Sequence, residues 1–181
     1  MSRGQMKYKY LTGDGPSRPI TDMNDPTDNL TPALFVHLDQ SPAGVLKRIR
    51  LLNGDRTLQL LNGRVRVINF WRPITTVDDW PLALCDGSTM SYDELLGVDL
   101  VRRDYVGSTM YAKYKPGYKR YYLEKQKPSE VCLFKNFDSS TDVPVTMCPH
   151  VSFAQDNAPG SPRLRESIEI RAFVYTKPRG G

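Results

Sequence analysis

Hydrophobic and polar positions alternate along much of the chain after residue 63. This alternation is strict at the start of Arg64–Trp71. Because successive side chains of a strand point to opposite faces, a period of two predicts β-structure. Further strands are predicted at Pro81–Cys85, Met110–Tyr114, Lys119–Leu123, Val131–Phe137, Thr146–Phe153 and Ser167–Tyr175. Six to eight short strands separated by turn signals favour a sandwich or barrel.

A different spacing precedes these strands. Ser41 and Pro42 provide a hydroxyl at a helix N-cap and a proline at the first helical position. Apolar residues then recur at intervals of three and four, at Val45, Leu46, Ile49 and Leu52. The pattern predicts a helix that ends at Asn53-Gly54, and a second short helix over Thr57–Leu61. We expect this helical segment to pack outside the strands.

The chain is predicted to divide into three parts. Residues 1–32 are rich in turn-forming residues, with one short strand near Tyr8 and Tyr10. Residues 33–176 form the folded domain, which opens on the β-like run Ala33–Asp39. Residues 177–181 form a tail.

Composition excludes several kinds of site. With 181 residues, of which 25% are charged and 39% hydrophobic, the chain suits one globular domain. Two histidines exclude a site of three imidazoles. Three cysteines, Cys85, Cys132 and Cys148, exclude a four-thiolate zinc site within one chain, and their apolar surroundings predict buried free thiols.

The net charge of +5 raises the question of a nucleic-acid partner. Basic residues and tyrosines mix over Lys113–Lys127, and such a mixture can stack on bases and neutralise phosphates. No nucleic-acid motif accompanies it, so a solvated strand pair, joined across Pro116-Gly117, is favoured over a basic nucleic-acid-binding module.

No apolar run reaches the ~20 residues that cross a bilayer. We therefore expect a soluble cytoplasmic protein with neither a nucleic-acid nor a membrane partner.

Both histidines belong to a candidate metal site. His37 and Asp39 are two residues apart on a predicted strand, so their side chains share one face. His150 follows on a separate β-like segment. Two imidazoles and one carboxylate on one side of an iron ion leave its other side open to oxygen and an organic ligand. The plain alternative is a surface histidine beside a helix-capping Asp39, with His150 unrelated.

A second pair of residues strengthens the metal interpretation. Arg165 and Ser167 share one face at the start of the last strand, 15 and 17 residues after His150. A guanidinium and a hydroxyl so placed can hold a carboxylate. The far carboxylate of 2-oxoglutarate needs such a partner. The alternative is that both residues lie on the solvent face of an edge strand.

Six segments of the sequence, in the same order along the chain, resemble one known protein family. The blocks are Val36–Ala43, Val67–Ile74, Trp80–Asp86, Glu130–Ser139, Pro149–Phe153 and Arg165–Ala172. They are similar to the fungal non-haem iron(II), 2-oxoglutarate-dependent oxygenases that include gibberellin desaturase, AsaB-type hydroxylase/desaturases, the cephem methoxylase component and the fumigatonoid endoperoxygenase. The resemblance implies a mainly β, double-stranded β-helix (jelly-roll) core with one or two flanking helices. It implies a hydroxylase or desaturase of small natural products, dependent on Fe(II), 2-oxoglutarate and O2.

The resemblance also implies roles for individual residues. Iron is expected on His37, Asp39 and His150, and 2-oxoglutarate near Arg165 and Ser167. Arg171 lies on the same strand face and is an alternative clamp for the co-substrate. The pocket or its supporting layer is expected to include Asn69, Trp71, Arg72 and Asp86. The structural alternative is that Trp71 belongs to the core and Arg72 pairs with a carboxylate. Asp138 and Glu169 are interpreted as supporting carboxylates rather than catalysts.

The chain departs from the family pattern before its His-x-Asp block, where relatives have a longer stretch. This difference keeps open a non-catalytic jelly-roll relative that serves as a binding partner or subunit, and it favours a homodimer. The block at His150 reads His-Val-Ser-Phe, where His-Thr-Ala-Phe is commoner.

Overall fold

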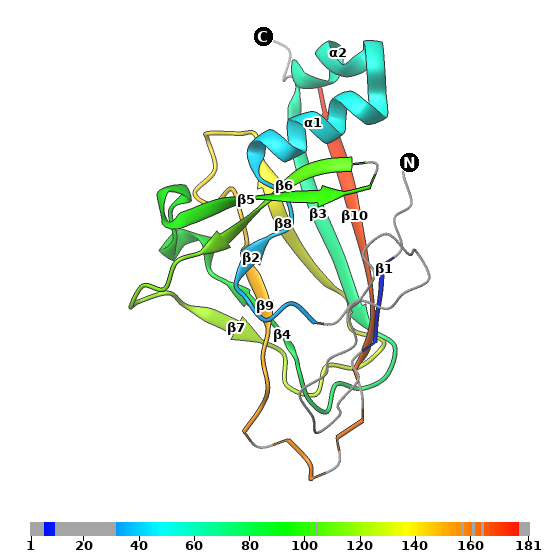
Figure 1. The fold of residues 1–181 in the computed structure, drawn as a ribbon, viewed down its shortest axis with the longest axis vertical. Coiled ribbons are helices and arrows are strands. Elements are labelled where there is room, and N and C mark those ends of the chain that lie inside the picture. The colour runs from blue at the N-terminus through cyan, green and yellow to red at the C-terminus, as the bar shows by residue number, and fades with distance from the viewer. Residues whose placement is uncertain are drawn as a thin grey trace.

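Two antiparallel sheets make up most of the molecule (Figure 1). This computed structural model describes residues 6–9, 32–103, 105–156, 158–160, 162–163 and 165–177. Sheet A contains, in order, β1 (Met6–Lys9), β10 (Glu166–Thr176), β3 (Arg64–Pro73) and β8 (Cys132–Asp138). Sheet B contains, in order, β5 (Leu95–Arg102), β6 (Tyr105–Ala112), β2 (His37–Leu38), β9 (His150–Ser152), β4 (Leu82–Cys85) and β7 (Arg120–Tyr122).

The helices lie at one end of the long β3–β10 pair (Figure 1). Helix α1 (Pro42–Asn53) begins where predicted, because the Ser41 hydroxyl accepts a hydrogen bond from the Gly44 amide at 3.0 Å. It ends at Gly54, whose φ of 51° suits a glycine. Helix α2 (Thr57–Leu61) also has the predicted bounds. Short 3-10 turns cover Gly54–Arg56, Gly87–Thr89 and Tyr92–Glu94.

Three apolar clusters hold these elements together. Val45 and Ile49 of α1 pack on Val65 and Val67 of β3, so the helix covers one end of sheet A. A second cluster joins Trp71, Val77, Leu82 and Phe134, and therefore bridges the two sheets. A third contains Leu38, Cys85, Met90, Leu95 and Met147, on sheet B and the turns beside it.

Some strand predictions were wrong in extent or partner. The run Ala33–Asp39 forms only the two-residue strand β2, and β5 was not predicted at all. Strands β6 and β7 do not form the expected pair across Pro116-Gly117, because three other strands separate them in sheet B. The predicted strand near Tyr8 exists as β1, paired with β10. The turn-rich segment 10–31 and residues 178–181 of the predicted tail lie outside the described residues.

The inner face of sheet A is apolar at its helical end and carries buried polar side chains further along. Strand β3 presents Val65 and Val67 at the helical end, then Asn69 and Trp71, all fully or almost fully buried. Where β3 pairs with β8, Val67 lies opposite Phe137 and the next residue, Ile68, lies opposite Lys135. Asn136 of β8 is therefore the extra residue of a β-bulge. Buried polar side chains are unfavourable unless they find partners, so the stretch around Asn69 and Asn136 is a candidate functional site.

Among the described residues, none of the helices combines the length and the apolar composition that a membrane span requires.

Candidate metal centre

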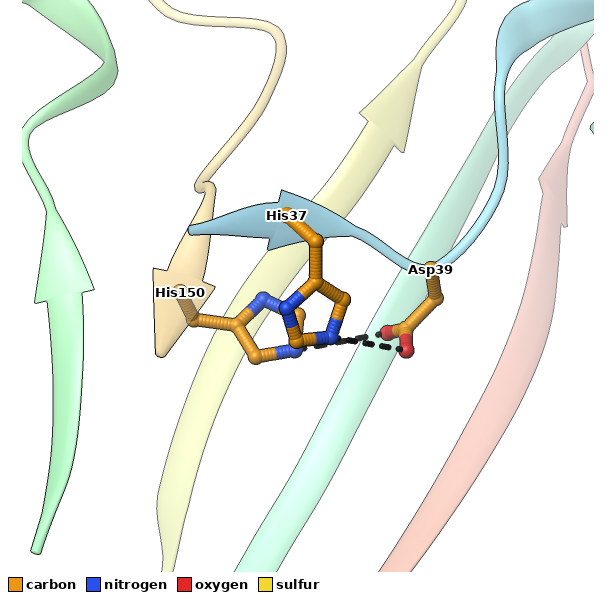
Figure 2. Close-up of side chains that lie close together, drawn as sticks. All are labelled: His37, Asp39 and His150. Atoms are coloured by element: carbon orange, nitrogen blue, oxygen red, sulfur yellow. Dashed lines mark ion pairs between the residues drawn. The ribbon is translucent and has the colours of Figure 1, made fainter. Parts of the chain in front are cut away.

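His37, Asp39 and His150 come together between the two sheets (Figure 2). His37 of β2 and His150 of β9 are direct cross-strand partners, and their ring centroids are 4.4 Å apart. Asp39 Oδ1 lies 3.8 Å from His37 Nε2, and its Oδ2 lies 3.6 Å from His150 Nε2. The side chains are 14%, 6% and 5% exposed in chain order, so one edge of the group meets solvent.

Each imidazole is fixed through its other nitrogen. Nδ1 of His37 lies 2.9 Å from the carbonyl oxygen of Phe35, and Nδ1 of His150 lies 3.3 Å from that of Cys148. A carbonyl oxygen only accepts hydrogen bonds, so each Nδ1 carries the proton. Both Nε2 atoms are therefore left with a lone pair turned toward Asp39, the arrangement of metal-binding histidines.

The Asp39 carboxylate is held on both oxygens. Asn69 Nδ2 donates to Oδ2 at 2.6 Å, and Arg171 Nη2 lies 2.8 Å from Oδ1. The backbone amide of Asp39 donates to Oδ1 of the bulged Asn136 at 2.9 Å. The turn that follows is fixed by Ser41, whose amide donates to the Ser108 carbonyl at 2.9 Å. Asp39 therefore has a defined position before any ligand arrives.

The electrostatics keep all three groups in their metal-binding forms. Burial, aided by the neighbouring His150, lowers the pKa of His37 to about 4. Burial also lowers the pKa of His150. For Asp39, burial acts to raise the pKa, but Arg171, the two histidines and Asn69 outweigh it and lower it to about 2. At neutral pH the site holds two neutral imidazoles and a carboxylate.

These residues fit a divalent transition metal ion. Two ligand atoms each ~2.1 Å from one ion are at most ~4.2 Å apart, and both imidazole–carboxylate distances fall below that value. Two nitrogens and one carboxylate oxygen on one side of an ion form the facial donor set of non-haem iron(II) sites.

Metal affinity should change little between pH 7.5 and pH 5.5, because the lowered histidine pKa values leave no proton to displace. Two histidines of ordinary pKa, about 6.5, would lose roughly 100-fold in affinity over the same range. Cobalt(II) titrations at the two pH values distinguish these cases. A 100-fold weakening at pH 5.5 would contradict the burial-shifted pKa values.

Arg165 and Ser167 lie further along the inner face that carries this site. Both are buried, at 5% and 0% exposure. Arg165 Nη1 donates to the Trp80 carbonyl at 2.8 Å and to the Ser152 hydroxyl at 2.6 Å, and the guanidinium lies over the Trp71 ring. The Ser167 hydroxyl finds no hydrogen-bond partner among the described residues. A buried hydroxyl without a partner, two residues from an oriented guanidinium, fits the carboxylate of a ligand.

The remaining predicted residues fall into two groups. Asn69 donates to Asp39, and the buried Trp71 lies under the Arg165 guanidinium, so both contact candidate site residues. Arg72 follows Trp71 on the opposite face of β3 and is exposed. Asp86 caps the 3-10 turn Gly87–Thr89, where it accepts from the amide and hydroxyl of Ser88. Arg72 and Asp86 therefore have no contact with the triad that would give them a place in the pocket.

The three cysteines are free, as predicted. Cys85 is buried, whereas Cys132 and Cys148 are half-buried. Burial raises the pKa of the Cys148 thiol to about 12, so it is a poor thiolate ligand although it lies two residues from His150.

Three residues at the site had not been singled out from the sequence. Asn136 holds the Asp39 backbone, Ser152 holds Arg165, and Tyr111 is the cross-strand partner of His37. Ser152 was detectable, because it lies two residues after His150 and so shares its face. Asn136 was detectable in the same way, because it alternates with the buried Phe134 and Asp138 along β8.

A row of uncharged side chains flanks the histidines across sheet B. Each residue of the row is the cross-strand partner of the next, in the order Leu96, Tyr111, His37, His150, Leu84 and Tyr121. Beside Tyr111, the 73%-exposed Phe35 makes an edge-to-face contact with its ring at 6.1 Å. The surroundings of the triad in sheet B are therefore apolar and aromatic, in contrast to the charged inner face of β10.

The chain is similar to known proteins over most of its length. Residues 13–175 match a family model described as Oxidoreductase/YMDC permease-like domain. Aspirochlorine biosynthesis protein N of Aspergillus oryzae is 34% identical over 139 residues, which are 75% of this chain and 58% of that protein. The Fe(II)/2-oxoglutarate-dependent dioxygenase nvfI of Aspergillus novofumigatus is 35% identical over 147 residues, 80% of this chain and 52% of that protein.

A solved structure extends the similarity to the fold. The iron and alpha-ketoglutarate-dependent endoperoxidase NvfI superposes with a TM-score of 0.81 and 30% identity, over 96% of this chain and 61% of its own. The predicted mainly β, jelly-roll fold is thereby confirmed. The chain spans about half the length of the curated relatives it matches.

Proposed function

This chain belongs to the fungal family of Fe(II)/2-oxoglutarate-dependent oxygenases of secondary metabolism, and from that premise we propose that it is itself a hydroxylase or desaturase of a small natural product. The family implies Fe(II), 2-oxoglutarate and O2 as cofactor and co-substrates. The observation that carries the proposal is the preformed group of two neutral imidazoles and one carboxylate, His37, His150 and Asp39, with ligand atoms all within 4.8 Å.

In this proposal His37, Asp39 and His150 hold the iron. When bound, iron(II) with 2-oxoglutarate and O2 supplies the oxidation of a substrate C–H bond, coupled to decarboxylation of 2-oxoglutarate to succinate and CO2. The chain contributes position and electrostatics: the Phe35 and Cys148 carbonyls orient the imidazoles, and Asn69 and Arg171 orient the carboxylate.

Arg165 is the proposed clamp for the far carboxylate of 2-oxoglutarate, with Ser167 as a second donor. Its guanidinium is fixed in advance by Trp80, Ser152 and the Trp71 ring, so little side-chain entropy is lost on binding. The sequence had left Arg171 as an alternative clamp. Arg171 is instead paired with Asp39 and Glu169, which favours Arg165 for this role.

The substrate is proposed to bind over the uncharged side of the site, near Tyr111, Leu96 and Phe35. These side chains are half-buried or exposed and carry no charge, so a neutral, largely apolar small molecule suits them. A homodimer, the absence of nucleic-acid binding and a cytoplasmic location stay predictions from the sequence.

Release of succinate tests the proposal. Protein incubated in air with iron(II), ascorbate and 2-oxoglutarate should form succinate above an iron-free control, slowly without substrate and faster with one. The Asp39→Ala variant should fall to the level of the iron-free control, because a metal ligand is lost. Equal succinate from wild type and variant would contradict the assignment.

A further inference from the structure

One amide nitrogen connects the metal-site carboxylate to a second buried carboxyl group. Asn69 is fully buried on β3, and its Nδ2 donates to Asp39 Oδ2 at 2.6 Å. The same nitrogen donates to Oε1 of Glu169, which lies on β10 and is only 5% exposed. Both hydrogens of one amide are therefore used by two carboxyl groups.

Arg171 makes a second connection between the same two groups. Its Nη2 lies 2.8 Å from Asp39 Oδ1, and its Nε lies 3.5 Å from Glu169 Oε1. Asp39 thus receives Asn69 on one oxygen and Arg171 on the other. Glu169 contacts both of these donors through a single oxygen, so it sits behind them relative to the metal site.

The other end of the Asn69 amide shows that this orientation has a cost. Its Oδ1 is buried and has no hydrogen-bond partner among the described residues. A buried acceptor without a partner is unfavourable, because it has lost its hydrogen bonds to water and gained none in return. The reverse orientation would place that oxygen against two carboxyl groups. The two carboxyl groups together therefore determine which way the amide faces.

We infer that Glu169 is a positioning residue of the metal centre, acting on Asp39 through Asn69 and Arg171. This inference rests on the proposed function and deepens it. With Glu169 in place, Asn69 must present its nitrogen to Asp39, and the Arg171 guanidinium is shared between two carboxyl groups. Without Glu169, the amide is free to turn, and Arg171 competes more strongly with a metal ion for Asp39.

The test compares cobalt(II) binding to Glu169→Gln, Glu169→Ala and a matched control. The Gln variant keeps an acceptor for Asn69 but removes the acid that shares Arg171, whereas the Ala variant removes both. Glu166→Gln is the control, because Glu166 precedes Ser167 on the same strand and points to the opposite face. The Glu169 variants should bind cobalt(II) about 10- to 100-fold more weakly, the range for outer-shell partners of metal ligands, with a shifted cobalt absorption spectrum.

A double-mutant cycle with Asn69→Ala separates positioning from general stability. If Glu169 acts through Asn69, Glu169→Ala should weaken binding less in the Asn69→Ala background than in wild type. Thermal unfolding of the metal-free proteins identifies any variant that fails to fold. If Glu169→Ala does not fold, the isosteric Glu169→Gln variant is compared with wild type instead.

The possible outcomes are distinguishable. Wild-type affinity and spectrum in both Glu169 variants, or additive effects in the cycle, would overturn the inference while leaving the metal site intact. A wild-type protein that binds no cobalt(II) would instead refute the proposed function. Weaker binding by the Glu166→Gln control to the same degree as by the Glu169 variants would also overturn the inference, since loss of any nearby acid would then have the same effect.

Discussion

Replacing His37 with alanine is expected to weaken iron(II) binding by more than 100-fold. His37 supplies one of only two imidazoles in the chain, and its Nε2 is aimed at the same point as Asp39 and His150. Loss of an outer-shell partner typically costs about 10–100-fold in metal affinity, so loss of a ligand itself should exceed that range. Anaerobic titration of iron(II) into the wild type and the variant measures the difference.

Phe35→Ala is the matched control for this change. Phe35 contacts the site through its backbone carbonyl, which the substitution keeps, while its exposed ring lies against Tyr111. Its iron(II) affinity should stay within about two-fold of wild type. Equal iron(II) affinity in wild type and His37→Ala would show that the triad is not the metal site.

Replacing Arg165 with alanine should weaken 2-oxoglutarate binding about 30-fold or more, with iron(II) binding unchanged. Removal of one partner from a buried, hydrogen-bonded charge pair typically costs 2–5 kcal/mol. Arg165 is 5% exposed, and its hydrogen bonds run to the Trp80 carbonyl and the Ser152 hydroxyl rather than to a proposed iron ligand. Calorimetric titration of 2-oxoglutarate into the iron(II)-loaded protein without oxygen gives the affinity.

Two further variants sharpen this result. Arg165→Lys keeps the charge but not the forked geometry, so its affinity should lie between those of wild type and Arg165→Ala. Arg163→Ala removes an exposed arginine two residues earlier and should bind 2-oxoglutarate as wild type does. If Arg165→Ala keeps full affinity while Arg171→Ala loses it, the clamp is Arg171.

Capping residues, turn residues and hydrophobic spacing predicted those elements whose bounds depend on residues close in sequence. Helix α1 has its expected bounds because Ser41 caps it and Gly54 ends it. Strand β5 was missed because its run, Leu95–Arg102, interrupts alternation with adjacent apolar pairs and a glycine. The pairing of β6 and β7 was wrong because sequence neighbours compete with distant strands, and here β2, β9 and β4 come between them. Partner choice is a tertiary property that turn residues alone do not determine.

Part of the site was predictable from the rule that residues two apart on a strand share one face. A His-x-Asp pair on a strand shares one face, and the structure brings His37 and Asp39 together with His150. Arg165, Ser167 and Glu169 also share parity, and all three are buried. Asn136 was not singled out, although it shares the buried face of β8 with Phe134 and Asp138 and the same parity rule applies to it. The family resemblance placed Arg72 with Asn69 and Trp71 in the pocket or its supporting layer, whereas in the structure Arg72 is exposed on the opposite face of β3.

The most direct test of the proposed function is an anaerobic titration of 2-oxoglutarate into the iron(II)-loaded protein, followed by visible absorption. Chelation of iron(II) by the keto acid at His37, Asp39 and His150 should produce a metal-to-ligand charge-transfer band that saturates at one 2-oxoglutarate per chain. The band should be absent from His37→Ala. No band in the wild type, or the same band in the variant, would contradict the site proposed here.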